Sequence, residues 1–258
     1  MYSCKSKFIL SVVMNQYFDQ VVMRKPFFFF GFVLMGINVL LMSFYFSGNS
    51  LFQSLIVPTL TGLDQNSWRE FGLLEMLQNV FLIILLVILI YGLIRQEKVL
   101  DKGLYIFAVF VFTFLFLEEI DYGLHYYEFV TGDTLEIDQR NWHNEVGADG
   151  HQNTRKIKRF SDFLMVVTFF LLPLLSLIKP LGRRLSRFSF VPVIYFSMSV
   201  VLTLILSKVA HYFNDAGFAI VDGVQGKLDN NISEFRETSI YYIYILYALQ
   251  LVRKPSLF

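Results

Sequence analysis

The sequence predicts an all-α, polytopic membrane protein with six transmembrane helices and both termini on the cytoplasmic side. Hydrophobic residues make up 55% of the 258 residues, and charged residues only 17%. The apolar residues come in continuous runs, whereas a soluble domain spaces them at amphipathic intervals. About 20 apolar residues suffice to cross a bilayer. The uneven distribution of charge along the chain gives the orientation.

Each predicted helix is an apolar run bounded by polar or charged residues. The first 25 residues precede these runs, and their apolar spacing fits either an amphipathic helix on the membrane surface or a flexible leader. The longest connection, residues 128–160, is polar and is predicted to be an outer loop, and residues 253–258 form a short cytoplasmic tail. The six-helix bundle covers residues 26–252, with spans at about residues 26–46, 73–94, 104–127, 161–178, 191–213 and 235–252.

Basic residues are concentrated on one side of the predicted bundle. The N-terminus, the connections after the second and fourth spans, and the C-terminus carry 13 basic and three acidic residues in total. The remaining nine basic and 18 acidic residues belong to the other side. Because cytoplasmic loops are enriched in Lys and Arg, the first side is predicted to be cytoplasmic. The single cysteine, Cys4, excludes an internal disulfide and a cysteine-based metal cluster.

The third run ends in "FLEEIDYGLHYYE", in which ionisable residues directly follow fourteen uncharged ones. Those fourteen residues rise roughly 21 Å along a helix, less than a hydrocarbon core about 30 Å thick. If the helix continues, Glu118 and Glu119 lie within the outer leaflet, where a carboxylate that faces lipid is costly. The set with i, i+3, i+7 and i+10 spacing is therefore predicted to share one face that points into the bundle: Glu118, Asp121, His125 and Glu128.

Three other predicted spans carry polar residues at the same depth. All four histidines fall on the predicted outer side, with His143 in the long loop, and the inner ends of the spans show no comparable set. We therefore expect one outward-facing polar site to which several helices contribute. The further polar residues are Glu75, Gln78 and Asn79 of the second span, Lys208, His211 and Asp215 of the fifth, and Glu234, Arg236 and Glu237 of the sixth.

Two kinds of chemistry fit these residue types. Carboxylates in a medium of low dielectric constant can act as general bases, and the predicted catalytic residues are Glu118, Glu119, Glu75 and Asp121. Imidazoles and carboxylates also bind zinc or a similar divalent metal, and the predicted ligands are His125, His143, His211 and Asp215. The structural alternative is a set of buried ion pairs that fixes the register of the helices.

Tyrosines cluster near the same predicted depth. An aromatic belt at the membrane interface explains them, and substrate stacking is the alternative for one or two. They are Tyr122, Tyr126, Tyr127, Tyr241, Tyr242 and Tyr244.

Three sequence blocks resemble an uncharacterised family of bacterial multi-pass membrane proteins. The family pattern is E-x-G-x-x-E-x-x-Q, then E-E-I-S-W-G-Q, then N-L-H-N. This chain has "EFGLLEMLQ", "EEIDYGL" and "NWHN", which together span residues 70–145. Asp121, Tyr122 and Leu124 depart from the Ser, Trp and Gln of the second block. The resemblance implies a site at these residues but no particular reaction.

A second similarity is to intramembrane glutamate proteases of the CAAX-processing type. Glu118–Glu119 and His211-x-x-x-Asp215 are similar to the first and last parts of the pattern of that family. Gly123 stands where the family has Arg, and a matching F-x-x-x-H block between the two parts is missing. The similarity is an analogy to a family of membrane hydrolases.

These observations predict an integral protein of a bacterial cytoplasmic membrane with a polar Glu/Asp/His site. The expected activity is that of a hydrolase or transferase that acts on a lipid-linked or membrane-associated substrate. Its partners are then the lipid bilayer and such a lipid substrate, and no nucleic acid is expected. The alternatives are a small transporter or proton-coupled permease that uses the carboxylates as a relay, and a structural subunit of a membrane complex.

Overall fold

The computed structural model describes residues 17–58, 71–133, 153–185, 188, 190–218 and 232–253, with the side chains of residues 153–158 excepted. All regular secondary structure within these residues is helical. The elements are η1 (Phe18–Val22), η2 (Phe28–Val33), α2 (Leu34–Tyr45), α3 (Ser50–Ile56), α5 (Leu73–Arg95), α6 (Val99–Glu119), η4 (Asp121–Gly123), α7 (Leu124–Thr131), α8 (Asn153–Met165), η6 (Val166–Leu171), α9 (Leu172–Leu175), α10 (Lys179–Leu185), α11 (Tyr195–Asp215) and α12 (Glu234–Val252).

The all-helical class predicted from the sequence is confirmed for the described residues, and several helices are apolar enough for a membrane protein, whereas the number of six spans is not confirmed. In the described residues, four helices are long and apolar enough to cross a membrane: Phe28–Tyr45, Leu73–Arg95, Val99–Glu119 and Tyr195–Asp215. A fifth is added if Arg159–Leu175 and Lys179–Leu185, which meet at a bend of 117°, form one broken span. The sixth predicted span lies in α12. This helix is long enough to cross a membrane, but its tyrosines and its charged first turn make it less apolar than the four helices named above.

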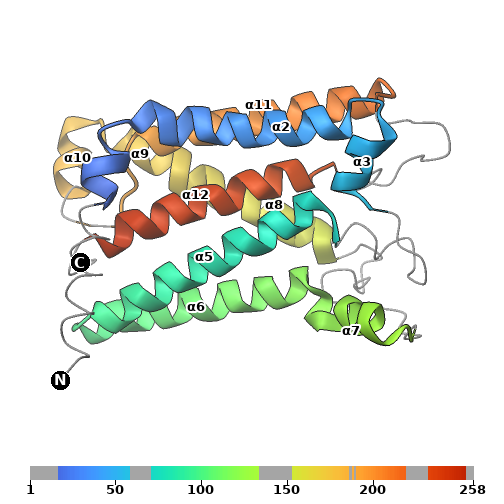
Figure 1. Ribbon diagram of the computed structural model, residues 1–258. Helices are drawn as coiled ribbons and strands as arrows, with labels where there is room; N and C mark the ends of the chain where they lie inside the picture. The colour runs from blue at the N-terminus through green and yellow to red at the C-terminus, as the bar shows by residue number, and fades with distance from the viewer. Residues whose placement is uncertain are drawn as a thin grey trace.

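Helix α12 is polar because the rest of the bundle surrounds it. It packs against α5, α11 and α2, and most of its residues are buried. Figure 1 shows α12 between the pair formed by α2 and α11 and the pair formed by α5 and α6. A helix covered by protein does not have to present an apolar surface to lipid, so it can carry buried polar groups that are hydrogen-bonded. Helix α6 lies at the edge, packs chiefly against α5, and exposes an apolar face.

Hydroxyl groups of α11 and α12 bind backbone carbonyls in the π-helical segments. Tyr242 donates to the Phe29 carbonyl at 2.9 Å, and Ser199 donates to the Phe30 carbonyl at 2.7 Å. π-Helical turns interrupt the regular backbone ladder, where such side-chain bonds are found. These contacts fix the first helical rod against the two C-terminal helices.

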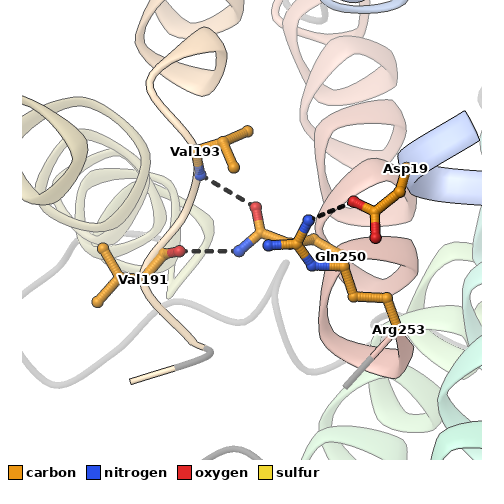
Figure 2. Close-up of polar contacts among 5 residues, drawn as sticks. All are labelled: Asp19, Val191, Val193, Gln250 and Arg253. Atoms are coloured by element: carbon orange, nitrogen blue, oxygen red, sulfur yellow. Dashed lines mark hydrogen bonds and ion pairs between the residues drawn. The ribbon is translucent and has the colours of Figure 1, made fainter. Parts of the chain in front are cut away.

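Two residues near the C-terminal end of α12, Gln250 and Arg253, make the three hydrogen bonds that Figure 2 draws. The buried amide of Gln250 donates to the Val191 carbonyl at 2.8 Å and accepts from the Val193 N–H at 3.0 Å. Arg253 donates to Asp19 at 2.6 Å. The segment before α11 and the N-terminal segment are therefore both attached to the same helix end.

The structure describes only parts of the segments that were predicted to lie outside the spans. Residues 1–16 and 254–258 lie outside the described residues, but Phe18 and Val22 are fully buried in the core. That part of the N-terminal segment packs into the bundle. The predicted outer loop 128–160 is shorter than expected, because α7 extends to Thr131 and α8 begins at Asn153. Residues 134–152 lie outside the described residues.

Candidate functional site

The third predicted span ends eight residues early. Helix α6 ends at Glu119, and the next turn has left-handed backbone angles, with φ of 46° at Asp121, 52° at Tyr122 and 83° at Gly123. Glycine adopts such angles readily, and a left-handed glycine commonly follows the end of a helix. For the other two residues this conformation costs about 1–2 kcal/mol each. The prediction that a single helical face carries the polar stripe is therefore wrong.

The turn nevertheless buries all four residues of the predicted stripe. After it, α7 folds back toward the start of α5, where the Phe71 ring contacts the His125 ring edge to face at 5.4 Å between centroids. Figure 1 shows α7 as a short separate helix at the C-terminal end of α6. The exposed fractions are 4% for Glu118, 8% for Asp121, 0% for His125 and 2% for Glu128. We call the end of the bundle that holds these residues, the start of α5 and the start of α12 the acidic end.

Each of the two consecutive glutamates accepts a hydrogen bond from a tyrosine. Tyr241 of α12 donates to Glu119 Oε1 at 2.5 Å, and Tyr122 in the turn donates to Glu118. The hydrogen bond to Glu118 raises the pKa of Tyr122 to about 12, because ionisation of the phenol would remove the donor and place a second negative charge beside the carboxylate. Both glutamates at the end of α6 are thus hydrogen-bonded to a tyrosine hydroxyl.

His125 is the most enclosed ionisable residue of this group. Its Nδ1 lies 3.9 Å from Asp121 Oδ2, which is an ion-pair distance for a protonated imidazole but too long for a hydrogen bond. The Tyr126 ring lies against the imidazole, with centroids 4.3 Å apart. Neither ring nitrogen has a hydrogen-bond partner among the described residues. The imidazole can therefore bind or release a proton on either nitrogen without breaking a hydrogen bond to those residues.

Residues from α5 and α12 form the neighbouring part of the acidic end. Gln78 of α5 donates to Glu234 Oε2 and to Thr238 Oγ1 of α12, both at 3.2 Å. Glu75 and Asn79 of α5 are also buried. Arg236 pairs with Asp162 of α8 at 3.0 Å. The second, third and sixth predicted spans thus supply buried polar groups to the same end, as the sequence predicted.

The fifth predicted span does not contribute to this group. Lys208, His211 and Asp215 of α11 are exposed, and α11 packs chiefly against α12, α2 and the π-helical segments η2 and η6. His143 lies outside the described residues. The structure therefore does not bring the three predicted zinc ligands that it describes, His125, His211 and Asp215, together. Within the described part of the chain, no three His, Cys, Asp or Glu residues are placed to hold a metal ion.

Two features of the buried polar groups differ from what the sequence predicted. Tyr241 and Tyr242 are buried and hydrogen-bonded, so the aromatic-belt interpretation is wrong for them. At the predicted inner ends, where no comparable set was expected, Gln96, Asp101 and Tyr105 are buried where α5 meets α6.

Comparison with protein-family models, curated proteins and solved structures finds no match. The two resemblances noted above therefore stay predictions. The first two blocks of the bacterial pattern do lie at the same end of the bundle, since Glu75 and Gln78 begin α5 while Glu118 and Glu119 end α6. The third block, residues 141–144, lies outside the described residues.

Proposed function

We propose that this protein is an acid–base hydrolase or transferase of a bacterial cytoplasmic membrane, with six spans and both termini in the cytoplasm. Its substrate is a lipid-linked or membrane-associated molecule. One observation carries the proposal. The two tyrosine-bound glutamates are followed by a strained, left-handed turn that holds Asp121, and then by the buried His125 that pairs with Asp121. Strained backbone of this kind is concentrated at functional sites.

The roles follow from the chemistry of each group. An imidazole with a carboxylate beside one nitrogen can accept a proton at the other, so His125 is the general base for water or a substrate hydroxyl. The charge of Asp121, 3.9 Å from Nδ1, stabilises the imidazolium that forms. Glu119, held by Tyr241, is the general acid: it starts protonated, gives its proton to the leaving group, and regains one when the proton that His125 took from water is passed on at the end of the cycle. Because the described residues do not offer three ligands at one place, no step is assigned to a metal ion.

A second candidate function is a proton-coupled permease. It is favoured by Asp101, which is fully buried near the opposite end of the α5–α6 pair from Glu118. Buried ionisable residues near both ends of one helix pair fit a relay that crosses the membrane. In this alternative, Asp101→Asn abolishes proton uptake into reconstituted vesicles.

The exposed residues of α11 provide matched controls for the enzymatic proposal. The purified protein is reconstituted into vesicles made from a total bacterial lipid extract, and lipids and released products are compared by mass spectrometry. We expect new products with the wild type and at least a roughly hundredfold lower rate with His125→Asn or Asp121→Asn, as for loss of a general base. His211→Asn and Asp215→Asn make the same changes at exposed positions and should leave the rate unchanged. Equal rates for His125→Asn and His211→Asn would contradict the proposal.

A further inference from the structure

One side of α11 presents an apolar surface outward, away from the bundle. Val201, Leu204, Ile205 and Tyr212 are 41%, 41%, 53% and 67% exposed. Lys208 is also exposed and lies on the same stripe, at the i+7 position from Val201. The opposite side of the helix, which includes Phe196, Val200 and Thr203, is buried. The stripe is thus an apolar face with a single cation.

An open groove runs along this stripe. Its volume is about 410 Å³, and it is lined by Leu204, Ile205, Lys208, Val209 and Tyr212. Its walls are the aliphatic side chains and the tyrosine ring, and the lysine contributes the only charged group of the lining. A groove of this composition fits a hydrocarbon chain that follows the helix.

Lys208 lies inside a helix that is long and apolar enough to cross a membrane. It precedes the helix end at Asp215 by seven residues, or about 10 Å. Within the described part of the chain, Lys208 makes no ion pair. A lysine at this depth is costly unless its ammonium group meets an anion or reaches the interface.

We propose that the α11 groove binds an anionic phospholipid, with the phosphate on the Lys208 ammonium group and one acyl chain along Leu204, Ile205 and Val209. Charge complementarity favours this occupant, because the groove combines a single cation with an apolar surface, and an anionic phospholipid offers both a phosphate and an acyl chain. Tyr212 lies one turn beyond the lysine, where its ring and hydroxyl suit the headgroup region. The inference rests on the membrane location in the proposed function and does not depend on the catalytic assignment.

Native mass spectrometry tests the proposal directly. The full-length protein in detergent is incubated with phosphatidylglycerol or with phosphatidylcholine, and the number of lipids that stay bound is counted. We expect preferential retention of phosphatidylglycerol, reduced about fivefold by Lys208→Gln, as for loss of one basic residue that attracts anionic lipid. Lys208→Arg keeps the charge and should keep the lipid. Lys102→Gln removes an exposed lysine of α6 and should have no effect.

A second variant addresses the groove without changing the charge. Ile205→Trp fills the groove, so it should also reduce lipid retention, and the unfolding temperature of each variant shows whether it is folded. His125→Asn should bind the lipid normally even if it abolishes activity, which separates the two proposals. Equal retention of both lipids, equal retention by wild type and Lys208→Gln, or a protein dimer that Lys208→Gln abolishes would each overturn the lipid assignment.

Discussion

Tyr241 provides a hydrogen-bond donor to a carboxylate inside the bundle. Its hydroxyl lies 2.5 Å from Glu119, and the tyrosine is only 6% exposed. Tyr241→Phe removes this donor and should lower the free energy of unfolding by about 1.5–3 kcal/mol, the usual contribution of a hydrogen bond to a charged group. Tyr212→Phe removes the hydroxyl of an exposed tyrosine and should change the free energy of unfolding little. Thermal unfolding in detergent measures both, and equal stability of the two variants would show that the bond does not stabilise the fold.

The contact between Glu118 and Tyr122 should be visible as a shifted titration. The pKa of Tyr122 is raised from 10.0 to about 12, chiefly by its hydrogen bond to Glu118. The contact therefore stabilises the fold fully below pH 10 and loses this contribution as the pH rises through about 12. Phenolate absorbance of the wild type minus that of Tyr122→Phe should titrate near pH 12. Glu118→Gln should move this titration toward the ordinary value, and a wild-type difference that already titrates there would contradict the contact.

At the residue scale, the sequence could predict that the polar residues are buried, but it could not predict their hydrogen-bond partners. The burial of Glu118, Asp121 and His125 followed from the cost of placing charged groups against lipid, and that argument holds whatever the local backbone does. The contact of Tyr241 with Glu119 joins residues 122 positions apart, so no local spacing indicates it. For His211 the predicted burial was wrong, because this residue is exposed. Its helical spacing from Lys208 and Asp215 predicted a shared face, but spacing does not say which way the face points.

The left-handed turn between α6 and α7 depends on glycine at one position. Gly123 has φ of 83°, and a Cβ placed there would meet no other atom within 4 Å. Gly123→Ala should therefore lower the free energy of unfolding by about 1–2 kcal/mol through backbone strain alone. Gly103 lies inside α6 with equally open surroundings, so Gly103→Ala should instead raise it by about 0.5–1 kcal/mol. Chemical denaturation measures both, and a shift of the same sign in the two variants would contradict this account of the turn.

At the element scale, the apolar runs located the helices, but two elements required tertiary information. The run that became α5, Leu73–Arg95, agrees with its prediction to within a residue, because its apolar stretch ends at charged residues on one side and polar ones on the other. The break after Glu119 could not be predicted, since "IDYGLHYY" also fits a continuing helix apart from one glycine. Helix α12 was assigned as a span from its length, whereas its polar composition reflects a position surrounded by protein.

The whole molecule is an antiparallel bundle whose successive rods run in alternating directions. The rods are η2 with α2, α5, α6, α8 through α9, α11 and α12, and Figure 1 shows the start of α2 and the end of α12 at the same end of the bundle as α10. If every rod crosses the membrane, the start and end of the chain lie on one side, and the basic residues assign that side to the cytoplasm. The composition of α12 does not mark it as a span, but it packs antiparallel to α11 and α2, as a sixth crossing requires.

Cysteine labelling can test both the number of crossings and the orientation. Cys4 is the only cysteine, so the native chain already carries one probe, and a Cys4→Ser background accepts others. Glu97 and Asp133 are exposed positions after the second and third predicted crossings. In sealed right-side-out and inverted vesicles, a membrane-impermeant maleimide should label Cys4 and Glu97→Cys only from the cytoplasmic side, and Asp133→Cys only from the outside.

Two predicted crossings separate Cys4 from Glu97, and a third separates Glu97 from Asp133. Labelling of Cys4 and Asp133→Cys from the same side would mean that one of the rods does not cross. A complete reversal of all three would keep the bundle and overturn the orientation.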